Sequence, residues 1–298
     1  MKDLRRAYLQ IHSSVVLWGF TAILGKLITL AEYSLVWHRL WMTCLCLLCL
    51  GGILPGLRLL SFKKMAPLVG TGILVAVHWV CFYGSIKYAN ISVALSCLAT
   101  TSFITALIEP VVTGKKVKLL DISTGLLVIP GVYLIFYFTK FYATGILLGL
   151  LAALFASLFT SLNKRMIEVT DARTMTFVEL SSGLLFLTAL LPFYFIVYPN
   201  QIFLPVAWDW TWLLILSAVC TALPFVLSLR ALKHLSAFAT SLAVNLEPVY
   251  GIILAVIIFK EDKELDGYFY VGTAIILAAV FMHPLLNMVR TRKKLIHQ

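Results

Sequence analysis

One long apolar stretch of the sequence, Ser236 to Glu261, carries polar residues in its middle. The stretch is long enough to cross a bilayer, yet it contains Asn245, Glu247 and Pro248. A charged residue in a membrane-spanning helix costs roughly 2.5–3.5 kcal/mol on insertion scales, so an acid here indicates a functional site. Because Pro248 has no backbone N–H, the carbonyl of Val244 loses its helical partner. Glu247 and this carbonyl are therefore expected to form a polar notch in the membrane.

Acids placed in this way suit proton exchange. A carboxylate is penalised by loss of water only while it is charged, so Glu247 is expected to be neutral in a closed cavity and ionised in an open one. Glu109 and Glu179 also lie in apolar segments and are secondary candidates for the same role. Glu109 shares a helical face with Ser102 and Thr105. Its alternative role is to pair with the lysines that follow its segment.

Basic and aromatic side chains could complete a cavity around these acids. Arg39 lies about one turn inside its apolar segment, where it either extends to the membrane interface or faces a cavity. His78, Trp79 and Tyr83 share one segment, and ordinary packing is the alternative for each of them. The side chains predicted to bind substrate or protons are Glu247, Glu109, Glu179, Asn245, Arg39, His78, Trp79, Tyr83, Trp18 and Thr240.

The composition predicts an all-α polytopic membrane protein. Hydrophobic residues make up 61% of the chain and charged residues only 12%, whereas a soluble domain has about 25% charged residues. Apolar runs of about 20 residues, the length of a spanning helix, recur along the sequence. Within the sixth run, Gly145 and Gly149 are spaced for close helix packing. The ten predicted spans are 8–29, 34–54, 66–86, 91–113, 119–139, 143–163, 174–198, 209–232, 236–259 and 267–288.

The distribution of basic residues predicts the orientation of the chain. The net charge is +11, and eighteen lysines and arginines fall on one side of the predicted spans against four on the other. This bias places both termini in the cytoplasm, and it explains the basic balance without a nucleic-acid partner. The basic tail at 290–294 is expected to touch anionic membrane lipid.

No signal in the sequence favours an enzyme, a metal site or a cofactor. The six cysteines lie in apolar segments and lack metal-ligand spacing, so neither disulfides nor zinc are expected. The motifs H-E-x-x-H and G-x-S-x-G are missing from the sequence, and no catalytic residue is predicted. The first apolar segment is interpreted as an uncleaved helix, since no small-residue cleavage site follows it.

The two halves of the chain resemble each other. Lys118-Leu-Leu-Asp121 matches Lys263-Glu-Leu-Asp266, and each follows a segment that contains Glu-Pro, although the two dipeptides fall at different depths. Five spans per half is an odd number, so the halves must have opposite orientations. Inverted repeats with interrupted helices are typical of transporters, with the substrate site near the midplane. The predicted domains are residues 1–140, a first five-helix repeat, and 141–298, a second repeat with the basic tail.

Several of these residues resemble a known family. Trp18-Gly19-Phe20 followed by Lys26 is similar to the opening of the EamA branch of the drug/metabolite transporter superfamily, and Arg39 is similar too. The segment Cys220–Glu261, with Cys-Thr-Ala-Leu-Pro, Ala-Leu-Lys-His-Leu-Ser-Ala and a mid-helix proline, is the strongest match. The resemblance implies a ten-helix inverted-repeat fold with a central cavity that moves metabolites such as amino acids by alternating access.

Two positions depart from the family pattern. The chain has Glu247 where the family often has Ser or Thr before the mid-helix proline. In the first half, the corresponding place near Thr101-Ser102 has no proline.

These features predict a secondary transporter, an exporter or exchanger of small polar metabolites, with proton coupling through a membrane acid. The cell inner membrane of a bacterium is the expected location, and a homodimer is a possible assembly. One alternative is an uncoupled facilitator or an antiporter of phosphorylated or nucleotide-sugar solutes. It would need cationic groups in the cavity, for which Lys26, Arg39 and Arg230 are the candidates. A non-transporting scaffold or receptor is the alternative from another class.

Overall fold

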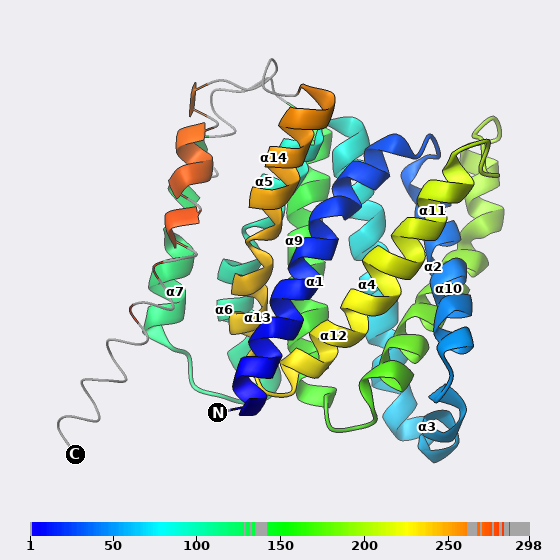
Figure 1. The fold of residues 1–298 in the computed structure, drawn as a ribbon, viewed down its shortest axis with the longest axis horizontal. Coiled ribbons are helices and arrows are strands. Elements are labelled where there is room, and N and C mark those ends of the chain that lie inside the picture. The colour runs from blue at the N-terminus through cyan, green and yellow to red at the C-terminus, as the bar shows by residue number, and fades with distance from the viewer. Residues whose placement is uncertain are drawn as a thin grey trace.

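The apolar segments form long helices in a computed structural model of the protein (Figure 1). The structure describes residues 2–127, 129–131, 133–134, 142–260, 267–268, 270–275, 277–279, 282 and 286. Within these ranges every regular element is a helix. The helices of the first half are α1 (Lys2–Leu27), α2 (Glu32–Leu50), α3 (Ile53–Leu59), α4 (Phe62–Tyr88), α5 (Ile91–Leu98), α6 (Thr101–Thr113) and α7 (Leu119–Leu126). Those of the second half are α9 (Ala143–Met166), α10 (Ala172–Val197), α11 (Asp209–Ser217), η1 (Ala218–Ala222), α12 (Leu223–Leu232), α13 (Ala237–Val244) and α14 (Glu247–Phe259).

Most of the predicted spans coincide with these helices. Seven helices or joined helices of the described chain are long and apolar enough to cross a membrane, and the bent pair of α2 and α3 would be an eighth. The predicted spans 91–113 and 209–232 match the helical limits. The fifth and tenth predicted spans lie partly outside the described residues, as do Asp266 and the basic tail. The count of ten therefore stays a prediction.

The second span ends earlier than predicted. Helix α2 stops at Leu50 because Gly51 and Gly52 adopt positive φ angles of 70° and 80°, a conformation in which a helix cannot continue. The chain then turns by 99° into the short helix α3. The boundary at residue 54 was wrong for this local reason.

Two spans are broken near their middle, one in each half, with matching dimensions. Helix α5 has 8 residues and α6 has 13, and α13 and α14 repeat the same lengths. Each pair begins at a side-chain cap, Asn90 before α5 and Ser236 before α13. The pairs run in opposite directions in Figure 1, with α13 beside α6 and α14 beside α5. This arrangement is the one that an inverted repeat requires.

The two breaks have different chemical causes. In the second half Pro248 stands in the first turn of α14, where a missing N–H is tolerated but where it ends the preceding helix. In the first half no proline is present, and hydroxyls bind the carbonyls left at the break. Thr100 donates to the carbonyl of Cys97 at 2.7 Å, and Thr101 donates to that of Leu98 at 2.6 Å.

Close packing at glycines fixes helix α4 between its neighbours. A Cβ atom at Gly145 would lie 2.6 Å from Ala89, and one at Gly149 would lie 2.7 Å from Cys97, so the predicted tight approach of these two glycines is confirmed. On the other side of α4, Gly72 lies against the backbone carbonyl of Glu179 in α10. The backbones of α4, α9 and α10 therefore have little freedom to move apart without losing these contacts.

Candidate functional site

A cavity lies between the two halves of the molecule. Its walls come from α1, α2, α4, α5 and α6 of the first half and from α9, α12, α13 and α14 of the second. The empty space between these walls, which includes space open to the outside, is about 840 Å³. The polar residues in its wall are Thr21, Arg39, His78, Thr101, Thr160, Asn163, Ser228, Thr240, Ser241 and Glu247.

Arg39 is the buried cation of the cavity. Its Nε donates to the hydroxyl of Thr221 at 2.8 Å, and its Nη1 donates to the hydroxyl of Tyr83 at 2.9 Å. The guanidinium carbon lies 3.8 Å from the ring centre of Trp79, a cation–π contact. No carboxylate of the described residues forms an ion pair with Arg39. The guanidinium therefore contacts only uncharged groups of the protein, and it also lines the cavity.

A local distortion of the helix brings Thr221 to Arg39. Residues Ala218–Ala222 form a π-helical turn between α11 and α12, and the Thr221 hydroxyl donates to the carbonyl of Leu216 in the last turn of α11. Such turns are rare and shift the side chains that follow, which is why they are common at functional sites. Sequence periodicity gave no signal for Thr221, because the pattern of apolar residues assumes an unbroken α-helix.

Glu247 lies in the cavity wall at the first position of α14. Its carboxylate is buried, and Arg39 and Thr21 are its polar neighbours. The start of a helix favours a negative side chain, because the backbone N–H groups there are unpaired. Glu247 thus faces neither lipid nor a lysine at the surface. It forms no ion pair within 4 Å among the described residues, so it is open to an exchangeable partner.

The other predicted cavity residues divide into two groups. His78, Trp79, Trp18 and Thr240 line the cavity together with Arg39 and Glu247. His78 is anchored through Nδ1, which lies 2.7 Å from the carbonyl of Ala152. Tyr83 is outside the lining but binds Arg39 directly.

Glu109 and Asn245 hold the two halves together and do not line the cavity. Glu109 accepts a hydrogen bond from the backbone N–H of Phe238 at 2.7 Å, so it caps the start of α13 from the opposite half. Asn245, at the break of the second span, donates to the hydroxyl of Ser102 at 2.7 Å. Neither of the two nearby lysines forms an ion pair with Glu109 within the described chain.

Glu179 sits behind the wall rather than in it. The Nδ2 group of Asn163, a lining residue, donates to Glu179 Oε2 at a long 3.3 Å. Asn163 was not among the predicted site residues, although its position near the end of an apolar segment marks it as a buried amide. It connects this second acid to the cavity.

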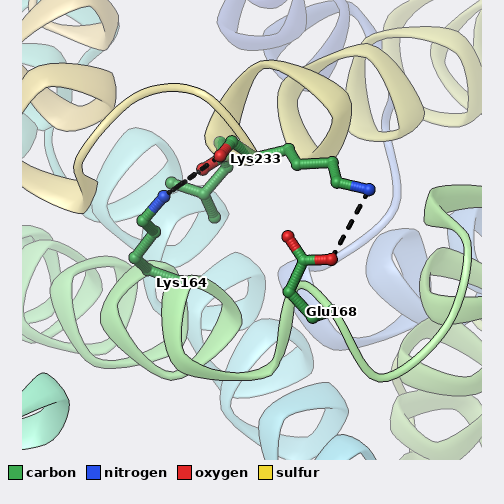
Figure 2. A network of polar contacts seen from close by, with 4 residues as sticks. Lys164, Glu168 and Lys233 are labelled. Carbon is green, nitrogen blue, oxygen red and sulfur yellow. Dashed lines mark hydrogen bonds and ion pairs between the residues drawn. The ribbon is translucent and has the colours of Figure 1, made fainter.

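The cavity reaches the end of the bundle at which the chain begins. Asn163 and Leu232, two of its lining residues, lie near the last residues of α9 and α12. These helix ends lie at the end of the bundle that carries the N-terminus in Figure 1. Figure 2 shows the polar contacts between these helix ends. Lys164 donates to the carbonyl of Leu232 at 2.7 Å, and Lys233 pairs with Glu168 at 3.5 Å. Both members of that ion pair are largely exposed, so it holds this end only weakly.

At the opposite end of the bundle, hydrogen bonds join the two halves. The carboxylate of Asp209 accepts hydrogen bonds from the backbone N–H and the hydroxyl of Thr29, at 2.9 and 2.6 Å. Lys26 is also at this end, 4.6 Å from the ring centre of Phe259 and away from the cavity. Arg230 lines a separate shallow pocket with Arg173.

Comparison with known families identifies the family of this chain. The profile of the EamA-like transporter family matches residues 5–137 and 143–283. The chain belongs to this family. It is therefore an integral membrane protein and a transporter of the drug/metabolite type, built from two EamA repeats, and members of this family are transporters rather than enzymes.

Solved structures share the fold of this EamA-like chain. One of them, titled only as a crystal structure of a protein, has a TM-score of 0.68 and 17% identity, and the match covers 94% of this chain and 97% of the other. At this identity the likeness describes the fold alone. A search of curated proteins gave no match.

Proposed function

We propose that this protein is a secondary transporter that exports or exchanges small polar metabolites, such as amino acids, by alternating access. The observation that carries the proposal is one cavity, lined by both halves, into which a buried arginine and a buried glutamate both face. Two oppositely directed broken spans border this cavity, as in transporters built from inverted repeats. The two halves are residues 1–140 and 141–298, each contributing five spans.

The charge of Glu247 supports proton coupling. An acid in the wall of a water-filled cavity ionises, whereas the same acid in a closed, dry cavity takes up a proton. Opening of the cavity to one side or the other would let Glu247 exchange its proton with that side. Arg39 lies in the same cavity and keeps its charge throughout the cycle.

The cavity points toward the cytoplasm if the positive-inside bias sets the orientation. Both termini are then cytoplasmic, and the end that Asn163 and Leu232 line is the inner end. The contact between Thr29 and Asp209 closes the outer end. A bacterial inner membrane is the proposed location.

The alternative of a phosphorylated or nucleotide-sugar substrate finds less support. Such a solute carries two or more negative charges, but of its candidate cations only Arg39 lines the cavity. Lys26 and Arg230 lie elsewhere. A cavity with one arginine and one glutamate favours a solute with little net charge.

The test is transport by the purified protein in lipid vesicles under an imposed pH gradient. Labelled amino acids are loaded into the vesicles, and their efflux is followed for the native protein, Glu247→Gln and the control Glu168→Gln. Glu168 is an acid at the exposed end of the bundle, outside the cavity. We expect gradient-driven efflux that Glu247→Gln removes and Glu168→Gln leaves unchanged.

Two outcomes contradict the proposal at different levels. Efflux by Glu247→Gln at the native rate, with an unchanged response to the pH gradient, would show that Glu247 does not couple protons to transport. An absence of flux for every solute in the folded native protein would favour a scaffold or receptor.

A further inference from the structure

Glu179 is a buried acid whose hydrogen bonding is incomplete. Its side chain is 0% exposed and that of Asn163 is 2% exposed. The single printed contact between them is the 3.3 Å bond from Asn163 Nδ2 to Glu179 Oε2. Glu179 Oε1 and Asn163 Oδ1 both lack a hydrogen-bond donor within the described chain. Buried polar atoms are rarely left unpaired, so two such acceptors on neighbouring side chains indicate that a donor belongs there.

No positive side chain neutralises Glu179. Helix α10 packs against α2, α3, α4 and α12, and Asn163 belongs to α9. The basic side chains on these helices and on α10 itself are His38, Arg39, Arg58, Lys63, Lys64, His78, Lys87, Lys164, Arg165, Arg173 and Arg230. None of them forms an ion pair with Glu179, and no charge among them contributes to its environment.

Each of these groups is engaged elsewhere or exposed. Arg39 is bound by Thr221 and Tyr83, and His78 by the carbonyl of Ala152. His38 contacts the carbonyl of Phe203, Lys87 donates to that of Ile28, and Lys164 binds the end of α12. The exposed members of the set are Arg58, Lys63, Lys64, Arg165, Arg173 and Arg230. A bare carboxylate without any of these partners would be highly unfavourable at this depth. Neutralising a charge on Glu179 at this place therefore requires a cation that enters from outside the chain.

The number of free oxygens favours a proton over a metal ion. Hard metal cations such as Mg²⁺ and Ca²⁺ take about six or more oxygen ligands. The orphaned acceptors at Glu179 and Asn163 number two in the described part of the protein. A proton on the carboxyl group removes the charge and supplies one O–H donor.

Asn163 suits both protonation states of its neighbour. Its amide has an N–H₂ group that donates to a carboxylate and an oxygen that accepts from a carboxylic acid. Asn163 can therefore keep a hydrogen bond to Glu179 in both states. Its amide NH₂ donates to the carboxylate, and after rotation of the amide its oxygen accepts from the carboxylic acid. Since Asn163 also lines the cavity, it is the route by which cavity water reaches Glu179.

We propose that Glu179 and Asn163 form a second proton site, distinct from Glu247 and reached from the cavity through Asn163. Glu179 is the eighth residue of α10, and Arg39 is the eighth residue of α2, so the halves place a titrating acid and a permanent cation at matching positions. The proposal rests on the proposed transport function for its role, but the site itself can be tested without transport.

The first experiment detects the proton directly. Infrared difference spectra of the native protein in lipid, taken between alkaline and acidic pH, should contain the carbonyl stretch of a protonated carboxyl group in a dry environment. We expect Glu179→Gln to remove one such band and Asn163→Ala to shift it. Glu168→Gln, at an exposed acid, should leave it in place. If Glu179→Gln removes no band at any pH, the proposal is wrong. Asn163→Ala keeps Glu179 and gives the answer if Glu179→Gln does not fold.

The second experiment measures stoichiometry in vesicles. If Glu179 and Glu247 each carry a proton, Glu179→Gln should lower the number of protons moved per solute by about two-fold, and solute binding should persist. An unchanged ratio, or a cycle driven by a sodium gradient and insensitive to pH, would contradict a proton at Glu179. A failure of all solute flux would contradict the proposed function, while the infrared result would still decide the site.

Discussion

At the scale of single residues, the cavity depends on a few side chains that bind one another. Arg39 is fixed by Thr221, Tyr83 and Trp79 on three sides, so its guanidinium has one orientation. This pre-positioning means that a solute need not order the side chain when it binds, which would otherwise reduce affinity.

Replacing Arg39 with lysine should impair transport although the charge is kept. A lysine has no planar fork and cannot bind Thr221 and Tyr83 together. Each hydrogen bond to a charged group contributes about 1.5–3 kcal/mol, so the loss of one should reduce efflux by about 10-fold or more. The measurement is initial efflux from vesicles, with Arg230→Lys as the matched change outside the cavity. Equal rates for Arg39→Lys and the native protein would show that the fork has no part in transport.

Glu109 should behave as a structural residue rather than a proton carrier. It caps α13, and loss of a cap costs about 1 kcal/mol, with more for a charged acceptor. We expect Glu109→Leu to lower the thermal unfolding temperature, and Glu109→Gln, which can still accept the bond, to lower it less. The pH-gradient response of Glu109→Gln should equal that of the native protein. Loss of the pH-gradient response in Glu109→Gln would show that Glu109 takes part in proton transfer.

The sequence identified those site residues that a regular helical pattern can reveal. The sequence spacing of Thr240 and Glu247 predicts that they share a helical face, and both line the cavity although the helix is broken between them. Thr221 could not be found because it depends on a π-helical turn. Glu109 was predicted to be a cavity acid because it lies in an apolar segment. Its partner is the backbone N–H of Phe238, far away in the chain, and sequence spacing does not show such contacts.

At the scale of helices, the two broken spans place polar residues next to the cavity. The mid-helix Pro248 marked the second break in the sequence. The first break was expected to differ, since Thr101-Ser102 has no proline, and it is made instead by threonine hydroxyls that bind carbonyls of the preceding turn.

Replacing Pro248 with alanine should straighten the second broken span at the expense of transport. The new N–H can bind the carbonyl of Val244, so the helix gains a hydrogen bond and Glu247 loses its place at a helix start. We expect unchanged or higher thermal stability, since the first-turn position of Pro248 costs little and the variant gains a backbone donor, together with a loss of efflux of about 10-fold or more. The control is Pro192→Ala, at a proline inside α10 that is distant from the break. A variant that transports at the native rate would show that the break serves packing alone.

At the scale of the whole molecule, hydrogen bonds join the two halves, among them those between Thr29 and Asp209 and between Glu109 and Phe238. The repeated Glu-Pro segments and the odd number of spans predicted opposite orientations, and the two broken spans do run in opposite directions. What the sequence could not predict is which end is closed. That depends on contacts between side chains far apart in the chain, such as Thr29 with Asp209.

Removing the contact between Thr29 and Asp209 should shift the protein toward opening at the far end. Asp209→Ala removes two hydrogen bonds to a buried carboxylate, each contributing about 1.5–3 kcal/mol, from the state described here. A change of about 3 kcal/mol is enough to alter the populations of two conformations more than 100-fold. Spin labels at the exposed positions Tyr88 and Trp208, one in each half and both near this end, would report the separation by pulsed electron resonance in a Cys49→Ser background. We expect the distance distribution to move to longer values in Asp209→Ala.

Lys233→Ala, which removes only an exposed ion pair at the other end, should leave the distance distribution unchanged, because such pairs contribute about 0–1 kcal/mol. If the Asp209→Ala distribution equals that of the native protein, the far end is not held by this contact, and alternating access would need a different gate.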